Sequence, residues 1–397
     1  MAKPKKDSTP EESVDSVKLL ARAFFKNHKA HIYNDPDEPF KVSTGVYSID
    51  EHLEGGIDSG TQVRLLGPPS SGKSSEGVLI IKNFLETRPK SRALIIPTEA
   101  RLTKKIKGRS GVPFVEDPEH WENGTCLILP MNVYEGIANF LVNLVKTNAM
   151  RKKEDRENFI IFIDCMDYLM READIPKELG EARIVAGSAY LTKQLWCLLA
   201  LPFNSGQHIF MGTSQQSAAP KIDKYAKDPL RQGGSSGGTN IQYQASTVID
   251  FLGRYEGDYI LENPTLKYDP KTNDKIGHTV HGLIRKSDTE RYDVKFDYKV
   301  KYGRSNGNCV WIESDIADWM QTYQLLYKES GKGSWLTVRE SLRKELMEID
   351  PEIPEKFQGI KVFMEYLENH EAVTKVLTKK MQSLMTVAPV ATEIELE

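Results

Sequence analysis

Six short apolar segments between residues 60 and 300 place the strongest constraint on how this chain can fold. They are QVRLL, RALIIP, CLILP, FIIFID, HIFMG and TVIDFL. Continuous apolar character, without alternation, is typical of strands buried on both faces of a sheet. Patterns at helical spacing separate several of these segments, over residues 76–87, 132–147 and 184–200. We therefore expect an α/β core with a mostly parallel central sheet and helical crossovers.

The regions on either side of this core indicate further units. The segment SVDSVKLLARAFFKN predicts an amphipathic helix that docks either on the chain's own core or on a neighbouring subunit. The alternating segment RYDVKFDYKVKY predicts an antiparallel strand with one solvated face, and residues 310–385 are expected to be mainly helical. We divide the chain into an N-terminal tail and helix (1–41), a core (42–305) and a small C-terminal domain (306–397).

Composition excludes several classes of protein. The formal net charge of the 397 residues is −3, so binding of a polyanion would require local basic patches. Cys126, Cys165, Cys197 and Cys309 show no CxxC spacing, which favours reduced thiols over a disulfide framework or a metal site. No apolar run approaches the roughly 20 residues that cross a bilayer, and the N-terminal segment is not typical of a secretory signal. We expect a cytoplasmic protein with no membrane partner.

The segment LLGPPSSGKSS, residues 65–75, matches the phosphate-loop pattern and joins an apolar strand to a helical stretch. The glycines allow backbone N–H groups to surround phosphates. The Lys73 ammonium would reach the β- and γ-phosphates, and the Ser74 hydroxyl can coordinate Mg²⁺. The predicted nucleotide-binding residues of this loop are Gly67, Pro68, Pro69, Ser70, Ser71, Gly72, Lys73, Ser74 and Ser75.

Two carboxylates follow other apolar strands. Asp164 ends FIIFID and could complete the Mg²⁺ site with Ser74, because ligands of open α/β sheets bind at the carboxyl ends of the strands. The alternative is that Asp164 caps the following segment. Glu99 follows ALIIP and is the candidate general base that orients or deprotonates water. Its alternative is an ordinary strand-to-helix turn.

These segments resemble the RecA family. Residues 43–75, STGVYSIDEHLEGGIDSGTQVRLLGPPSSGKSS, are similar to the start of the RecA ATPase core, and the spacing from Lys73 to Glu99 and Asp164 fits that family. Within the family, the bacteriophage UvsX-type recombinases look nearest, because RKSDTERYDVKFDYKVKYG resembles their closing turn and strand. The segment QGIKVFMEYLENHEAVTKVLTKKMQSLM is similar to the last helices of the bacterial RecA C-terminal domain. The resemblance covers roughly residues 40–385.

The resemblance implies a DNA-dependent ATPase that uses ATP and Mg²⁺. Such a protein forms a helical filament of its own copies on single-stranded DNA and exchanges strands with double-stranded DNA in recombination, repair and replication. Single-strand-binding and mediator proteins would be further partners. The expected location is the nucleoid in the cytoplasm, or the host cytoplasm for a phage protein. The N-terminal helix would then serve oligomerisation.

Site residues follow from the same resemblance. The γ-phosphate sensor falls on Thr213, with Ser214, Gln215 or Gln216 as alternatives after a small change of register. The adenine-stacking residue of the family falls near Ile106. A cation that reaches the nucleotide of a neighbouring subunit matches Lys286, and Arg285 or Arg291 would supply a second one where the chain has Asp288. The alternative is that RKSD is a solvated turn.

The DNA-binding loops of the family map to residues 170–183 and 214–239. Basic side chains neutralise phosphates, an aromatic ring stacks on bases, and glycines act as hinges. The alternative for the second loop is an ordinary solvated connection, although its length is unusual for a passive loop in a compact core. Its candidate DNA-binding residues are Lys221, Lys224, Tyr225, Lys227, Arg231, Gly237 and Gly238.

Two other functions stay open from the sequence. One is a RecA-fold ATP-binding regulator or assembly factor without strand exchange, and the other is a ring-forming helicase. The long second loop and the similarity of residues 358–385 favour the recombinase. Weak agreement at the sensor position favours the regulator.

Overall fold

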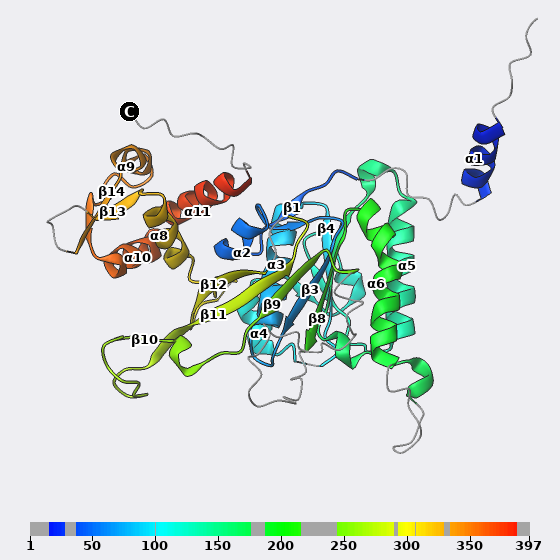
Figure 1. Cartoon of the computed structure of the whole chain (residues 1–397), viewed down its shortest axis with the longest axis horizontal. Coiled ribbons are helices and arrows are strands. Elements are labelled where there is room, and N and C mark those ends of the chain that lie inside the picture. The colour runs from blue at the N-terminus through cyan, green and yellow to red at the C-terminus, as the bar shows by residue number, and fades with distance from the viewer. Residues whose placement is uncertain are drawn as a thin grey trace, which may run out of the picture.

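The computed structural model is described here for residues 16–27, 37–99, 101–175, 187–215, 244–289, 293–305, 307–328 and 334–386. It has a large α/β core and a smaller C-terminal unit, with helix α1 (Ser16–Asn27) near the N-terminus (Figure 1). The α/β class with a mostly parallel central sheet, which the apolar segments predict, is confirmed.

All six predicted apolar strands lie in one sheet of ten strands. The pairs β3–β8, β3–β9, β7–β8, β4–β7 and β4–β6 are parallel, so these strands end at the same edge. Strand β8 lies between β3 and β7, which places the carboxyl ends of these three strands side by side. In spatial order the strands are β10 (Tyr259–Leu261), β11 (Lys275–Lys286), β9 (Thr247–Phe251), β3 (Gln62–Gly67), β8 (Ile209–Gln215), β7 (Asn158–Ile163), β4 (Ser91–Ile96), β6 (Cys126–Ile128) and β5 (Phe114–Val115), with β12 (Val294–Lys301) on β11.

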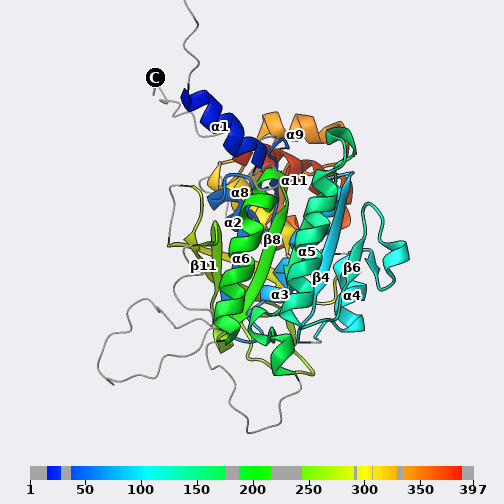
Figure 2. The same cartoon turned by 90° about the vertical axis from the view of Figure 1, so that its right-hand side faces the viewer.

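Helices cover both faces of this sheet. Helix α3 (Lys73–Thr87) packs on one face, and α5 (Tyr134–Ala149) and α6 (Gly187–Ser205) lie side by side on the other (Figure 2). The neighbouring residues Leu65 and Leu66 of β3 are buried in different clusters, one on each face. This two-sided burial is the reason for the continuous apolar runs. Among the described helices, none combines the length and hydropathy that crossing a membrane requires.

The alternating strand at the end of the core is present as β12, which pairs antiparallel with β11. Phe296 and Tyr298 of β12 are buried, whereas Lys295 and Asp297 are exposed. The prediction of one dry and one solvated face is therefore confirmed. Shorter core elements are β1 (Lys41–Val42), α2 (Tyr47–His52), β2 (Ile57–Asp58), α4 (Lys104–Ser110), and the 3₁₀ turns η2 (Pro118–His120), η3 (Lys153–Asp155), η4 (Met166–Tyr168), η5 (Glu172–Asp174) and η6 (Glu256–Asp258).

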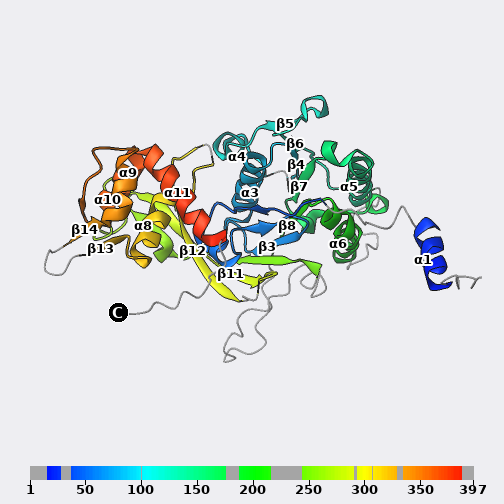
Figure 3. The same cartoon turned by 90° about the horizontal axis from the view of Figure 1, so that it is seen from above.

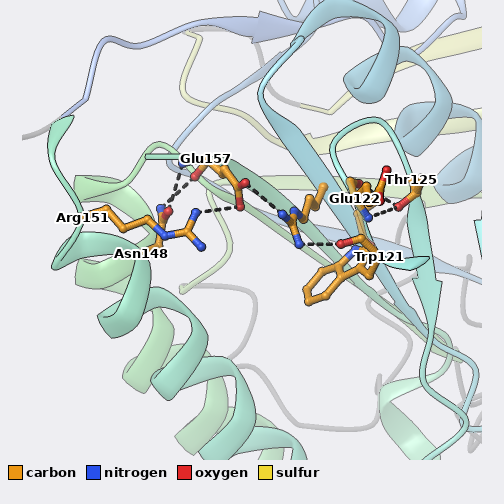
Figure 4. A network of polar contacts seen from close by, with 8 residues as sticks. Trp121, Glu122, Thr125, Asn148, Arg151 and Glu157 are labelled. Carbon is orange, nitrogen blue, oxygen red and sulfur yellow. Dashed lines mark hydrogen bonds and ion pairs between the residues drawn. The ribbon is translucent and has the colours of Figure 1, made fainter. Parts of the chain in front are cut away.

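A polar network joins the amino ends of the parallel strands (Figure 4). Glu157, which immediately precedes β7, pairs through its two carboxylate oxygens with Arg92 at 3.1 Å and Arg151 at 3.2 Å. Asn148 of α5 exchanges two hydrogen bonds with the Glu157 backbone, at 2.8 and 3.0 Å. This network lies at the opposite edge of the sheet from the carboxyl strand ends, where Asp164 and Glu99 lie.

The C-terminal unit has its own apolar core, which includes Ile316, Trp319, Leu326 and Phe363. The expected helices are present, and the structure adds a three-stranded antiparallel sheet that the sequence did not reveal. Strands of three or four residues are too short to show an alternating pattern. The elements are α8 (Ile312–Thr322), β13 (Leu326–Lys328), β14 (Trp335–Val338), α9 (Glu340–Met347), β15 (Lys356–Gln358), α10 (Ile360–Asn369) and α11 (Glu371–Thr386).

Helix α1 is the amphipathic helix predicted near the N-terminus. Its apolar side chains are largely solvent-exposed: Leu19 by 52%, Leu20 by 73% and Phe25 by 49%. In Figure 3 the helix lies beyond α5 and α6, apart from the central sheet. Of the two docking alternatives, this exposure disfavours burial on the chain's own core, and docking on a neighbouring subunit stays a prediction.

Candidate nucleotide-binding site

The predicted phosphate loop connects β3 to α3, as its sequence pattern requires. Gly67 and Gly72 have φ angles of 144° and 111°, in the region that side chains other than glycine rarely adopt. A Cβ at Gly67 would lie 2.4 Å from the Phe251 carbonyl oxygen, so only glycine fits there. The loop ends at the amino terminus of the 15-residue helix α3, whose first N–H groups and dipole favour an anion.

Lys73 folds back onto this loop. Its ammonium donates hydrogen bonds to the carbonyl oxygens of Gly67, at 2.8 Å, and Pro68, at 2.6 Å. Burial lowers the pKa of Lys73, whereas the nearby Asp164 and Glu99 charges act in the opposite direction. The positive charge is thus held beside the loop, where phosphate oxygens would replace neutral carbonyls as its partners.

A cavity of about 310 Å³ opens beside the loop, within the usual range for ligand pockets. It brings together the loop residues from Pro69 to Ser75 and the strand-end residues Glu99, Asp164 and Thr213. Gly67 and Pro68 do not line it, although their carbonyl groups hold Lys73. Ile106, near which the resemblance to RecA places an adenine-stacking residue, is also in the wall. Segments far apart in sequence therefore meet as predicted.

The Thr213 hydroxyl forms a hydrogen bond with Asp164. Its Oγ1 donates a hydrogen bond of 2.6 Å to Asp164 Oδ1 across the adjacent strands β8 and β7. This bond orients the carboxylate that we predicted as a Mg²⁺ ligand. Thr213 therefore contacts Asp164 in the cavity wall, and its role as the γ-phosphate sensor stays a prediction.

Gln215, an alternative candidate for the γ-phosphate sensor, contacts the other candidate carboxylate. Its Nε2 donates a 2.8 Å hydrogen bond to Glu99 Oε1, and it lines the cavity. Glu99 Oε2 forms a 2.9 Å ion pair with Arg101, and the Glu99 side chain is 9% exposed. Residues 213 and 215 share one face of β8 because side chains alternate along a strand. The two hydrogen bonds give Thr213 and Gln215 different carboxylate partners, and the choice of sensor stays a prediction.

Two further buried or partly buried polar residues, Asp167 and Arg64, contact the end of β8, and the sequence analysis did not identify them. Asp167 accepts a 2.6 Å hydrogen bond from the Gln215 backbone N–H, and burial raises its pKa. Arg64 of β3 is fully buried and donates a 3.4 Å hydrogen bond to Ser214 Oγ. Burial lowers the pKa of Arg64 to about 10, against the effect of the Asp167 charge. The available signal was a lone arginine within the apolar segment QVRLL.

Glu76 is a buried acid in the wall of the same cavity, and it too was missed. It is 1% exposed and lies in the first turn of α3. Its Oε2 accepts a 3.3 Å hydrogen bond from the Tyr298 hydroxyl, and its Oε1 has no partner among the described residues. Burial, and secondarily the Asp50 carboxylate, raises the pKa of Glu76 to about 8. The carboxyl is therefore mostly protonated at neutral pH.

This shift predicts a pH-dependent stability. The pKa of Glu76 is about 8 in the folded protein against a reference value of 4.5. Its contribution to the free energy of unfolding is therefore fully present below about pH 4.5, where the carboxyl is protonated in both the folded and the unfolded chain. That contribution is lost as the pH rises to 8, on the order of a few kcal/mol. We expect Glu76→Gln, which keeps an acceptor for Tyr298, to lose less stability than the wild type between pH 5 and 8. Urea unfolding of the nucleotide-free protein at several pH values measures this.

The exposed residue Glu119 provides the matched control. Glu119→Gln removes the same kind of charge from the surface and should leave the pH dependence of unfolding as in the wild type. Parallel pH profiles for Glu76→Gln and the wild type would show that Glu76 does not titrate with folding.

The two cations expected to act on a neighbouring subunit do not line this cavity. Arg285 is held within its own chain, by Asp250 at 3.0 Å and Asp293 at 3.1 Å. The buried Asp250 makes this pair structural, which disfavours Arg285 as a second cation. Lys286 ends β11, and its role towards a neighbour stays a prediction. Arg291 lies outside the described residues.

Most of the predicted DNA contacts also lie outside the described part of the chain. Strand β8 ends at Gln215 and the description resumes at residue 244, while the first loop is described only to Ile175. The contacts that are not described are Lys221, Lys224, Tyr225, Lys227, Arg231, Gly237 and Gly238.

No protein-family model matches this chain, and a search of curated proteins also found no match. The comparisons therefore assign neither a family nor an activity. The functional argument depends on the site residues and their geometry.

Proposed function

We propose that this chain binds ATP with Mg²⁺ in the cavity beside the phosphate loop and hydrolyses the terminal phosphate. The observation that carries this proposal is the convergence of Lys73, Glu99 and Asp164 on one cavity. They come from three segments and stand at the carboxyl edge of a parallel sheet, where ligands of such folds bind. A cation, a candidate base and a candidate metal ligand thus surround an anion-binding loop.

The residues fit a magnesium ion. Ser74 and Asp164 provide oxygen ligands in the cavity wall, and Thr213 orients the carboxylate. Within the described residues, no group of three or more His, Cys, Asp or Glu could hold a metal alone. Mg²⁺ commonly needs only one or two protein ligands, because phosphate oxygens and water complete its shell. When bound, it would neutralise charge on the phosphates.

The polar residues around the cavity would have different roles in hydrolysis. Glu99 would accept a proton from water as the water oxygen bonds to the terminal phosphorus and the bond to the bridging oxygen breaks. Gln215 and Arg101 hold the Glu99 carboxylate at 2.8 and 2.9 Å. Lys73 and the loop N–H groups would stabilise the negative charge on the phosphates.

We further propose that ATP controls DNA strand exchange, as in RecA-type recombinases and nearest to the bacteriophage UvsX type. The resemblance of residues 43–75, 285–303 and 358–385 supports this. So does the position of Gln215, which contacts the candidate base and immediately precedes the long basic segment. DNA contacts in that segment could then act on Glu99 through Gln215. The partners would be single- and double-stranded DNA and further copies of the chain, with Lys286 reaching the neighbour's nucleotide.

Electron microscopy with single-stranded DNA and a slowly hydrolysed ATP analogue tests the assembly. Extended helical filaments are expected. Closed rings would support a helicase instead, and nucleotide binding without any assembly would support a regulator. Either result would remove the recombinase proposal while leaving nucleotide binding in place.

The basic segment after β8 allows a separate test. Replacing Lys221, Lys224, Lys227 and Arg231 with alanine should weaken binding of single-stranded DNA and flatten its salt dependence. Fewer counterions would be released, so the slope of log affinity against log salt should fall by about 0.7 for each lost phosphate contact. Fluorescence anisotropy at several salt concentrations measures the slope.

The control replaces Lys146 and Lys152, which are exposed near the end of α5, away from the site. Those two substitutions should leave the slope unchanged. An unchanged slope in the four-residue variant would place the DNA on another surface.

A further inference from the structure

Arg254 stands at the edge of the phosphate loop, and nothing in the sequence reading assigned it a role. The chain that leaves β9 runs beside the loop: a Cβ on Gly253 would lie 3.6 Å from Pro68, and Gly67 closely approaches the Phe251 carbonyl. The next residue, Arg254, donates a long hydrogen bond of 3.5 Å to the Ser70 carbonyl oxygen. Arg254 also lines the cavity that holds Lys73 and Asp164.

His278 of β11 holds the guanidinium of Arg254 in this position. Arg254 and His278 Nε2 are 2.7 Å apart. Arginine has no acceptor, so Nε2 accepts and the imidazole proton is on Nδ1. His278 is 7% exposed, and burial together with the Arg254 charge lowers its pKa to about 4, which keeps the ring neutral. The Arg254 guanidinium carbon also lies 5.8 Å from the centre of the Tyr259 ring.

Arg254 differs from the cations Arg101 and Lys73 of the cavity wall in the groups that surround its charge. Arg101 is neutralised by Glu99 at 2.9 Å, and Lys73 is enclosed by loop carbonyls. The two hydrogen-bond partners of Arg254 are both uncharged, and no carboxylate of the described residues forms an ion pair with it. A held guanidinium without a counter-charge, next to an anion-binding loop, fits a phosphate group.

We propose that Arg254 binds the terminal phosphate of the nucleoside triphosphate within its own subunit, and that His278 positions it. This inference rests on the proposed nucleotide binding and adds a cation supplied by the same chain, whereas Lys286 would act on a neighbour. The inference also gives the residues that follow β9 a role in nucleotide binding. The chain lines this cavity at Gln215, where β8 ends, and again at Arg254, shortly after β9 ends.

The test compares equilibrium binding of ATP and ADP by calorimetry, with the full chain, Mg²⁺ and no DNA. Arg254→Ala should weaken ATP binding about tenfold to a hundredfold, the usual effect of losing a charge-assisted hydrogen bond. ADP binding should change less than about threefold, because ADP lacks the terminal phosphate. Arg254→Lys keeps the charge and should restore part of the ATP affinity.

Two substitutions of His278 separate positioning from a structural role. His278→Gln can still accept a hydrogen bond from Arg254 and should preserve the ratio of ATP to ADP affinity. His278→Leu cannot accept one, so that ratio should fall towards the value of Arg254→Ala. Equal loss of both nucleotides in His278→Leu, with the ratio unchanged, would contradict the positioning role.

Control variants distinguish this inference from the proposed function. Lys271→Ala removes an exposed cation from the loop between β10 and β11, and should leave both affinities unchanged. Lys73→Ala should weaken both nucleotides, and binding unaffected by Lys73→Ala would reject the nucleotide site itself. If Lys73→Ala weakens binding but Arg254→Ala and Arg254→Lys keep the wild-type ratio of ATP to ADP affinity, only the Arg254 inference is rejected.

Discussion

Replacing Lys73 with alanine is expected to lower ATP turnover by about two to three orders of magnitude. The Lys73 ammonium is the charged group of the phosphate loop. Hydrogen bonds to the Gly67 and Pro68 carbonyl oxygens already hold this ammonium beside the loop. Removing a group that stabilises developing charge in a protected site has an effect of this size. Steady-state phosphate release in the presence of single-stranded DNA measures it.

The matched control is Lys82→Ala, on the same helix α3 but paired with Glu86 at 2.9 Å. That variant should keep wild-type turnover, because its ammonium does not line the cavity. Normal turnover by Lys73→Ala would remove the assignment of residues 67–75 as the phosphate loop.

Glu99→Gln is expected to bind ATP with nearly wild-type affinity but to hydrolyse it about a hundredfold to ten-thousandfold more slowly. The amide retains an oxygen that can accept the Gln215 hydrogen bond, yet it cannot take a proton from water. Complexes with ATP and DNA should consequently be long-lived. Single-turnover kinetics, with a separate binding measurement, distinguish the two steps.

Glu116→Gln serves as the control, because Glu116 pairs with Lys107 and does not line the cavity with Glu99. It should leave turnover unchanged. Loss of ATP binding in Glu99→Gln would make Glu99 a structural residue, and normal hydrolysis would place the base elsewhere.

The sequence was most informative where a single physical cause dominates. Burial of both sheet faces produces continuous apolar runs, so the parallel strands were predicted. Because parallel strands end at one edge, Glu99 and Asp164 were predicted to meet near Lys73, and all three line one cavity. The phosphate-loop glycines were equally readable, because residues other than glycine rarely adopt φ angles such as 144° at Gly67 and 111° at Gly72.

The residues that the sequence missed, or whose roles it left open, depend on packing between segments distant in sequence. Thr213 and Gln215 share a face of β8, and only the contacts with Asp164 and Glu99 distinguish them. Arg254 approaches the loop because β9 packs against β3 in a parallel register. Glu76 occupies a favourable first-turn position for an acid, which concealed its burial.

The most direct test of the account is the rate of ATP hydrolysis by the intact protein with and without single-stranded DNA. We expect Mg²⁺-dependent hydrolysis that single-stranded DNA stimulates, and we expect Lys73→Ala to lower its rate by about two to three orders of magnitude. Hydrolysis that DNA does not change would contradict the recombinase proposal. The absence of both ATP binding and hydrolysis in the folded protein would contradict the nucleotide site itself.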